Sequence, residues 1–156
     1  MQIEQSVSFR LHTSCSEIST PTKKERETMK ITISTVRKII KLAEAQNNAY
    51  GLYTQKYFPD GIISFGEDQH ETSPEYLEYK KLSERLDKFI LSLDYEQVLD
   101  LEALMILGRG DESCFKSCRD YLAKTHPNPE GKYLAVEYIT SKHPLPDYLE
   151  NALRKI

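Results

Sequence analysis

Two cysteines lie one helical turn apart in the second half of the chain. Cys114 and Cys118 are four positions apart, so on a helix their thiols could share a metal ion if two further ligands approached. The histidines that could supply such ligands are scattered, at positions 12, 70, 126 and 143. We therefore favour buried small side chains for both cysteines, with a redox pair as the alternative, and we expect no metal or other cofactor.

A second group of reactive side chains is acidic. Glu67, Asp68, Glu71 and Glu75 gather around His70, just before a segment with a helical pattern. Carboxylates at such spacing can hold a divalent cation or transfer protons. A solvated negative patch that leads into a helix is the more common role of such a cluster, so we predict no metal ligand and no catalytic residue here.

The tripeptide Arg109-Gly110-Asp111 is the one that integrins read in extracellular ligands. The chain does not start with the basic and apolar stretches of a signal peptide, so we favour a structural turn. Gly110 would permit a tight bend, and Asp111 would cap the next helix. An exposed Arg109 could also anchor a carboxylate or a partner protein. Arg109 and Asp111 are therefore candidate interaction residues.

Tyrosine is a fourth chemical feature, with ten tyrosines and no tryptophan in the chain. Tyr53 and Tyr57 fall in the segment 50–72. We predict that this segment is a long loop, because its helical pattern is interrupted at Gly51, Pro59, Asp60, Gly61 and Gly66. Amphipathic rings serve either packing or an interface. We name Tyr53 and Tyr57 as further candidate interaction residues.

Other catalytic signatures are missing from the sequence. It contains neither the phosphate-binding loop nor the dinucleotide-binding glycine pattern, and no serine stands in a nucleophile-elbow motif. We therefore predict no catalytic residue.

Helical signals are dense after position 33. Apolar residues recur at three-and-four spacing, and capping residues precede them. The expected helix starts are Ser34 or Thr35, Ser73-Pro74, Asp94 with Gln97 as a capping-box pair, Asp111, Asn128-Pro129, and Pro144.

Helix ends are predicted from the stop signals that follow each stripe. The first helix should end around Asn47-Asn48, the third at Gly108 as a left-handed stop, and the fourth before Pro127. In the fifth helix, Leu134 and Tyr138 are available to the core. Residues 62–65 are predicted to form at most a short strand or an apolar plug in the loop.

Length and composition bound the fold and the partners. A chain of 156 residues with 39% hydrophobic residues is long enough for one domain with a real core. Its 21 basic and 24 acidic residues are intermixed, with a net charge of −3, so we expect no nucleic-acid partner. No apolar run approaches the ~20 residues that span a membrane. Three cysteines agree with a reducing compartment, and we expect a cytoplasmic protein with no membrane partner.

The chain divides near Met29. Residues 1–29 carry no sustained periodicity and few large apolar groups, so they are interpreted either as a disordered arm or as a gene-model extension, with translation beginning at Met29. Residues 30–156 are predicted to form a single helical domain. The fold class is all-α: a compact bundle of five or six short helices with one long loop and a disordered amino-terminal arm.

Two motifs resemble those of a known family. They are the Leu-Gly-Arg-Gly-Asp turn at 107–111 and the carboxyl-terminal segment 138–150, which reads Tyr-Ile-Thr-Ser-Lys-His-Pro-Leu-Pro-Asp-Tyr-Leu-Glu. In combination they are similar to a family of uncharacterised, mostly bacterial proteins that is described only as a domain of unknown function. The resemblance extends from about Ile31 to the carboxyl terminus. It implies a helical fold and no activity, and the insertion of His143 before Pro144 departs from the family pattern.

Three functions stay open at this point. We favour a small soluble, non-enzymatic protein-interaction or regulatory module, which binds an unknown protein partner or self-associates. The alternative is a small-molecule or metal-binding helical domain, in which the loop at 50–72 folds over a pocket. An enzyme of unrecognised type comes third, because catalytic residues can converge from distant helices without a linear motif.

Overall fold

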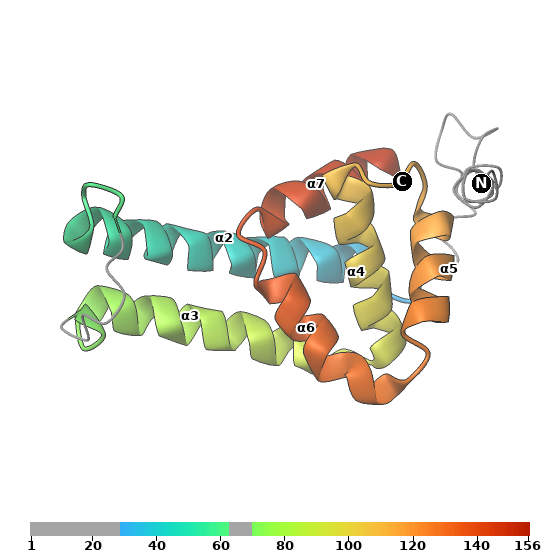
Figure 1. Ribbon diagram of the computed structural model, residues 1–156, viewed down its shortest axis with the longest axis horizontal. Coiled ribbons are helices and arrows are strands. Elements are labelled where there is room, and N and C mark those ends of the chain that lie inside the picture. Colours follow the sequence, from blue (N-terminus) through green and yellow to red (C-terminus); the bar gives the residue numbers. More distant parts are fainter. Residues whose placement is uncertain (1–28, 63–69) are drawn as a thin grey trace, which may run out of the picture.

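The computed structural model describes residues 29–62 and 70–156. These residues form six α-helices and one 3₁₀ helix, with no strand among them, and the all-α bundle prediction is confirmed (Figure 1). The elements are α2 (Ile33–Tyr57), α3 (Pro74–Leu91), α4 (Tyr95–Arg109), α5 (Phe115–Thr125), η3 (Pro129–Gly131), α6 (Lys132–Thr140) and α7 (Leu145–Lys155).

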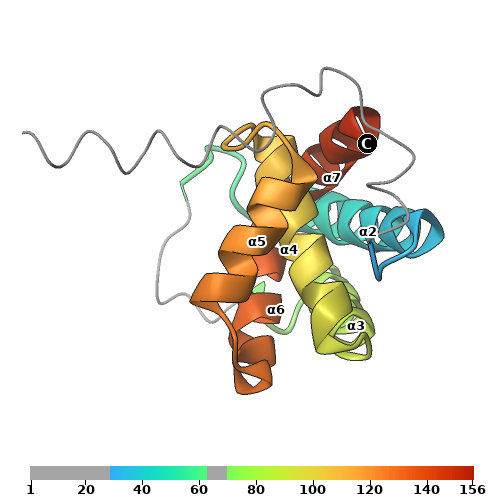
Figure 2. The same ribbon diagram turned by 90° about the vertical axis from the view of Figure 1, so that its right-hand side faces the viewer.

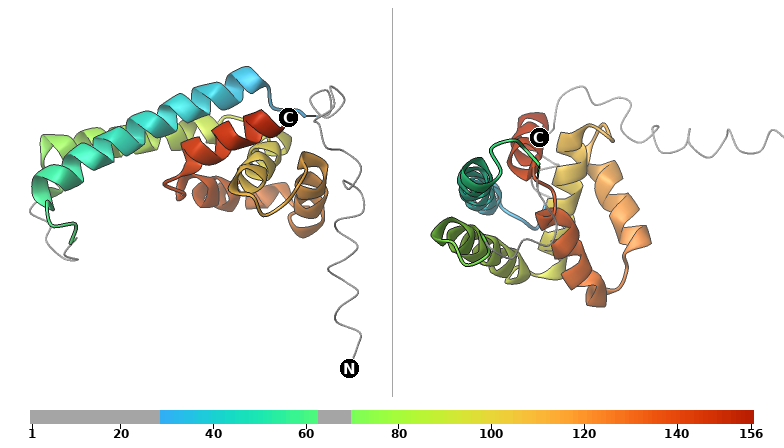
Figure 3. Two further views of the ribbon diagram at one scale, coloured as in Figure 1. Left: turned by 90° about the horizontal axis from the view of Figure 1, so that it is seen from above. Right: turned by 60° about the vertical axis from the view of Figure 1, so that its left-hand side comes forward.

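Helices α2 and α3 lie side by side as a long hairpin that projects away from the remaining helices (Figures 1 and 3). Helix α4 crosses near the other end of this hairpin and packs against α5, α6 and α7. Figure 2 shows α5 and α6 on the same flank of α4. Helix α4 is therefore the element that fixes the position of most others.

Helix α4 begins as the sequence predicts. The Asp94 side chain accepts from the backbone N–H of Gln97 at 2.9 Å, and the Gln97 side chain accepts from the Asp94 N–H at 3.1 Å. This reciprocal capping box satisfies two amides that the first helical turn leaves without partners. Apolar residues cover nearly every side of the helix, so it is buried all round.

The end of α4 differs from the prediction. The left-handed residue is Gly110, with φ of 94°, and Gly108 is still helical. Gly108 has a different role, because a Cβ atom at this position would overlap the backbone carbonyl of Tyr148 in α7. Glycine is thus required at 108 for the close approach of α4 and α7, and at 110 for the turn.

Helix α2 is longer than predicted. Its amino-terminal cap is Thr32, whose hydroxyl accepts from the Thr35 N–H at 3.1 Å, and the helix passes through Asn47, Asn48 and Gly51 to Tyr57. The prediction of a loop from residue 50 was wrong for residues 50–57. Packing against α3 explains the difference. The rings of Tyr50 and Tyr53 in α2 contact those of Tyr79 and Tyr76 in α3, and this packing outweighs the weak helix propensity of asparagine and glycine.

Asp111 does not cap α5. The residue at the amino-terminal cap is Cys114, which makes no side-chain capping bond, and Asp111 instead contacts Arg109. The carboxyl-terminal end agrees with the prediction, since α5 ends at Thr125 with His126 as its cap, just before Pro127. The Asp111 carboxylate therefore pairs with Arg109 and does not cap the helix start that the sequence pattern assigned to it.

Helices α3, α6 and α7 begin close to their predicted starts. The Asn128 side chain accepts from the Glu130 N–H at 3.0 Å and starts η3, which leads into α6, and Ser73 caps α3 with Pro74 in its first turn.

The assignment of Leu134 and Tyr138 to the core was wrong, because Leu134 is 68% exposed and Tyr138 is exposed as well. Both lie on the solvent side of α6.

One buried acid ties the start of α2 to α4 and α5. Asp100 is 2% exposed, and its Oδ2 accepts from the backbone N–H of Lys30 at 2.5 Å and of Ile31 at 3.1 Å. Its Oδ1 accepts from Arg119 Nε at 2.9 Å, and Arg119 also contacts Glu96. A buried carboxylate with this many donors is well compensated for its loss of water.

Some predictions fall outside the described residues. These are the amino-terminal arm, over residues 1–28, and the strand or plug, over residues 63–65. Of the helices that the structure describes, none combines the length and apolar character needed to cross a membrane.

Candidate functional site

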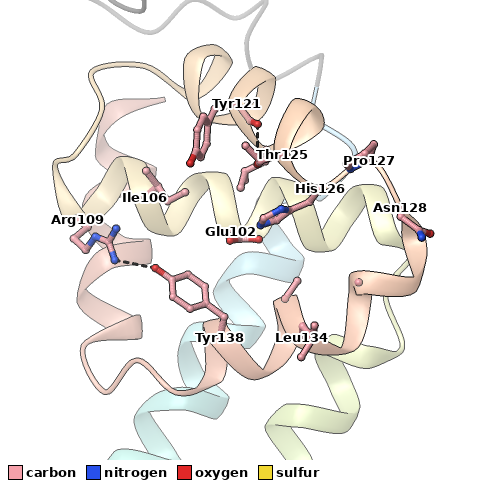
Figure 4. Close-up of a pocket in the computed structure, with 13 residues that line it drawn as sticks. Glu102, Ile106, Arg109, Tyr121, Thr125, His126, Pro127, Asn128, Leu134 and Tyr138 are labelled. Atoms are coloured by element: carbon pink, nitrogen blue, oxygen red, sulfur yellow. Dashed lines mark hydrogen bonds between the residues drawn. The ribbon is translucent and has the colours of Figure 1, made fainter. Parts of the chain in front are cut away.

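A cleft of about 620 Å³ lies between α4, α5, η3 and α6. Figure 4 shows Tyr121, Thr125, His126 and Tyr138 around Glu102, with α4 as the floor. Its lining residues are Glu102, Ile106, Arg109, Tyr121, Leu122, Thr125, His126, Pro127, Asn128, Gly131, Leu134, Ala135 and Tyr138. The cleft is thus built by three helices that the sequence places one after another, and by the turn between α5 and α6.

Glu102 is the most unusual group of the cleft. It is 4% exposed, and its fully buried Oε2 has no hydrogen-bond partner among residues 29–62 and 70–156. Burial raises the pKa of the Glu102 carboxyl above its ordinary value of 4.5, and the nearby His126 opposes part of that shift. Native structures rarely leave buried polar atoms without partners, so this atom calls for an explanation.

Arg109 stands at the end of the cleft, where α4 terminates. Its Nε donates to Asp111 Oδ2 at 2.5 Å, and its NH1 donates to the Tyr138 hydroxyl at 3.2 Å (Figure 4). These hydrogen bonds, the one to Tyr138 first, raise the pKa of the Arg109 guanidinium, which stays charged. Two of the predicted interaction residues, Arg109 and Asp111, therefore lie together at the rim of this cleft.

Large apolar side chains border the cleft on its solvent side. Leu134 and Tyr138 extend from α6, and Tyr121, which is 53% exposed, extends from α5 (Figure 4). Tyr133 is also largely exposed on α6. Exposed apolar groups that gather around one depression are typical of binding surfaces, whereas single ones are normal anywhere.

His126 and Tyr95 complete the polar part of the site. His126 lies beside Glu102 in Figure 4, and its backbone carbonyl accepts from the Tyr95 hydroxyl at 2.7 Å. Burial raises the pKa of the Tyr95 hydroxyl, so it remains a donor over the neutral range. This bond holds the residue that follows α5 against the start of α4.

Tyr53 and Tyr57 lie elsewhere, at the tip of the α2–α3 hairpin. The ring of Tyr53 packs against that of Tyr76, with 5.3 Å between centroids, and the ring of Tyr57 stacks on His70 at 4.4 Å. The Tyr57 hydroxyl donates to Glu75 Oε2 at 3.0 Å. The four predicted interaction residues thus fall into two separate groups, and only one of them borders the cleft.

Cys114 and Cys118 are buried, as favoured from the sequence. Cys118 is a free thiol, and burial, with the negative charge of Glu112 adding to it, raises its pKa to about 12. A thiol with that pKa stays protonated and is a poor nucleophile or metal ligand. Within residues 29–62 and 70–156, no three His, Cys, Asp or Glu side chains gather in a way that could hold a metal ion.

The acidic cluster before α3 is only partly described, since Glu67 and Asp68 lie outside the described residues. Glu75 forms an ion pair with Lys56, with 2.5 Å between Nζ and Oε1. The hydrogen bond from Lys56 lowers the pKa of Glu75. This carboxylate therefore joins α2 to α3, as a surface pair does.

Sequence reasoning missed Glu102, His126 and the exposed face of α6. A signal for Glu102 was present, because residues 98–107 read Val-Leu-Asp-Leu-Glu-Ala-Leu-Met-Ile-Leu. A helix that is apolar on every side is buried, so its two acids must be buried as well. Each of these acids then needs a partner, and a buried acid without one marks a candidate site.

Comparison with protein families gives a match over the carboxyl-terminal part of the chain. Residues 83–156 match the family model described as Protein of unknown function (DUF3775), and the whole cleft lies within that segment. No curated protein and no solved structure matches the chain. The match confirms the resemblance to an uncharacterised family, although it begins at residue 83, whereas the motifs suggested a start near Ile31. From residue 83 to its end, the chain is therefore similar to a family of proteins of unknown function, DUF3775.

Proposed function

We propose that this protein is a non-enzymatic interaction module, whose cleft between α4, α5 and α6 binds a segment of a partner protein. One observation carries the proposal: a buried carboxylate without a partner, Glu102, lies at the base of a cleft with exposed apolar side chains around it. A bound segment would cover the apolar rim and supply the missing partner.

The character of the rim supports a protein partner. Tyr, Leu and Arg side chains border the cleft, and tyrosine and arginine are enriched at the centres of protein interfaces. Pockets for small molecules commonly bury 70–90% of the ligand surface. Leu134 and Tyr121 are more than half exposed, so this cleft is open on one side and suits a chain that passes across it.

The candidate interaction residues divide under this proposal. Arg109 belongs to the rim, where Asp111 and Tyr138 hold its guanidinium in place. Tyr53 and Tyr57 lie in the last turns of α2 and are not lining residues of the cleft. An interaction of their own stays a prediction, which this proposal does not require.

A small-molecule-binding domain is the second candidate, in the same cleft and not under the segment 50–72. The observation that favours it is volume, because about 620 Å³ lies within the range of ligand pockets. A thermal-shift screen with metabolites separates the two candidates, since a small ligand of the cleft would raise the melting temperature of the protein but not that of a variant with Leu134 replaced by aspartate.

A display selection tests the proposed function. Random peptides are selected on the full chain, and their positions are mapped by amide chemical shifts. We expect peptides that shift the resonances of the cleft and that bind Leu134→Asp about tenfold more weakly or worse, as a charge at the centre of an apolar contact would cause.

The matched control is Leu52→Asp, because Leu52 is a similarly exposed leucine on α2, outside the cleft. Its binding constants should equal those of the unmodified chain. Selection of no peptide, or of peptides that bind Leu134→Asp as well as the unmodified chain, would refute the proposed function.

A further inference from the structure

We infer that the partner segment places a cationic side chain, that of a lysine or arginine, against the Glu102 carboxylate. This inference rests on the proposed function and adds the chemical identity of the group that is recognised. Its evidence is the unmet hydrogen-bonding capacity of Glu102, the engagement of the neighbouring donors with other groups, and the apolar walls above the carboxylate.

The capacity of Glu102 defines the chemistry of its partner. An ionised carboxylate only accepts hydrogen bonds, so the group that satisfies it must donate. Oε2 is fully buried and has no donor in the structure. A buried negative charge also needs a positive charge nearby to offset its lost hydration, and a guanidinium or ammonium group meets both requirements at once.

Two donors near Glu102 are directed elsewhere, while the His126 ring lies beside the carboxyl and offsets part of the effect of its burial. Arg109 donates to Asp111 and to the hydroxyl of Tyr138, and Tyr95 donates to the backbone carbonyl of His126. Because these groups are already paired, none of them needs to turn toward Glu102. The carboxylate is thus left open to a donor that comes from outside the chain.

The walls of the cleft suit the stem of a long basic side chain. Ile106 of α4 and Leu134 of α6 provide apolar surface around Glu102 (Figure 4), and Leu122 lines the cleft as well. Lysine and arginine bury their methylene groups along such surfaces while the charged end reaches a polar group. Tyr121 and Tyr138 present aromatic rings to the same space, and such rings attract cations.

Net charge at the cleft permits this partner. Arg109 is the lining residue with a fixed positive charge, and Asp111 neutralises it by an ion pair. Glu102 is the lining carboxylate, and the nearby His126 opposes only part of the effect of its burial. A cation that enters above α4 therefore meets a carboxylate that forms no ion pair among the described residues.

A double-mutant cycle tests the inference. Each basic residue of a selected peptide is replaced by norleucine, and the peptides are titrated against the full chain and against Glu102→Gln, which preserves shape and removes the charge. We expect one replacement to weaken binding to the unmodified chain about tenfold or more, and to weaken binding to Glu102→Gln less than about twofold.

Asp120→Asn is the matched control, since Asp120 is an exposed acid on α5 that pairs only with Lys116 among the described residues. The norleucine replacement should keep its full effect in this variant. Peptides that bind the cleft without any essential basic residue, or an equal loss in Glu102→Gln, would overturn the inference while leaving the proposed function intact. Failure to select any cleft-binding peptide would instead refute the proposed function.

A probe without a peptide gives a second, independent readout. n-Butylguanidinium and its uncharged analogue 1-pentanol are titrated against the labelled protein. The cation should shift the resonances of residues around Glu102 at concentrations about fivefold or more below those required in Glu102→Gln, whereas pentanol should bind both proteins equally weakly. Equal responses to the cation in the two proteins would overturn the inference.

Discussion

Two buried acids on α4, only two positions apart, have opposite environments. Asp100 accepts three hydrogen bonds, from two backbone amides before α2 and from Arg119 of α5. Glu102 is nearly as buried, yet its Oε2 has no donor in the part of the chain that the structure describes. We call the surroundings of Asp100, together with the contact of α4 with α7, the closed side of α4, and the cleft around Glu102 the open side.

The comparison separates structural from functional burial of charge. On the closed side the chain supplies every donor that the carboxylate needs, so Asp100 holds elements together. On the open side the chain leaves a desolvated acid with a raised pKa, which costs stability in the free protein. Residues that lower stability without an internal benefit are typical of binding sites, and the predictions below test this contrast.

Removal of the paired acid should have the largest effect. Asp100→Ala breaks three hydrogen bonds and leaves two backbone amides and part of Arg119 without partners. We expect the free energy of unfolding to fall by about 3 kcal/mol, as measured by urea denaturation. Asp120→Ala, at an exposed ion pair on α5, should cost about 0.5 kcal/mol or less. Equal losses in the two variants would contradict a structural role for Asp100.

The contact of α4 with α7 should be nearly as sensitive. Gly108→Ala places a methyl group on the carbonyl of Tyr148, so the helices must separate, and we expect a loss of about 2–3 kcal/mol. Gly51→Ala is the control, because no atom lies within 4 Å of the added group in α2. That variant should gain about 0.5–1 kcal/mol, since alanine favours helix over glycine. A tolerated Gly108→Ala would show that the two helices are not in close contact.

On the open side the sign of the effect should reverse. Glu102→Gln removes a buried charge without a partner, so it should stabilise the protein by about 1 kcal/mol at neutral pH. The folded-state pKa of Glu102 is raised above its ordinary value of 4.5. The folded protein therefore holds this proton to higher pH than the unfolded chain, and its stability falls as pH rises from the unfolded pKa through the folded pKa.

The advantage of Glu102→Gln should consequently disappear below a pH of about 4, where both states carry the proton. Urea denaturation of both proteins across this range measures it. A destabilised Glu102→Gln at neutral pH would mean that the carboxylate has a partner inside the folded chain.

The smallest effect is expected at the rim of the open side. Leu134→Ser removes an apolar side chain that is mostly exposed, so thermal unfolding should show a change within about 0.5 kcal/mol. Leu104→Ser, at a fully buried leucine of α4, should unfold the protein or cost about 3 kcal/mol or more. A large loss in Leu134→Ser would place α6 with its leucine in the core, and the cleft would then be closed.

Local signals in the sequence predicted the starts of α3 and α4, but not the cap of α5. Ser73-Pro74 and the Asp94–Gln97 capping box act through bonds within one turn, so their pattern alone determines them. The end of α2 was not predictable in this way, because it depends on contacts between the tyrosine rings of α2 and those of α3. Gly108 and Gly110 illustrate the same limit: one is needed by a distant helix and the other by the local turn.

The site could be predicted only in part. Arg109 was identified from its exposed place in a turn, and the structure puts it at the rim of the cleft. Leu134 and Tyr138 were assigned to the core because periodicity marks an apolar face without saying whether another element covers it. The acids of α4 carried a usable signal, but the difference between Asp100 and Glu102 depends on residues 30, 31 and 119, which are remote in sequence.

The titration of Glu102 itself tests the central claim most directly. In uniformly ¹³C-labelled protein, the Cδ shift of Glu102 is followed from about pH 3 to pH 9, with and without a saturating cleft-binding peptide. His126, Tyr95 and Arg109 face or adjoin this carboxyl, so the His126 ring shifts are recorded in the same samples. We predict that the pKa of Glu102 lies above 4.5 in the free protein and falls when the peptide binds, because a cation stabilises the ionised form. A pKa that stays constant or rises on binding would show that no cation reaches Glu102, and would contradict the account.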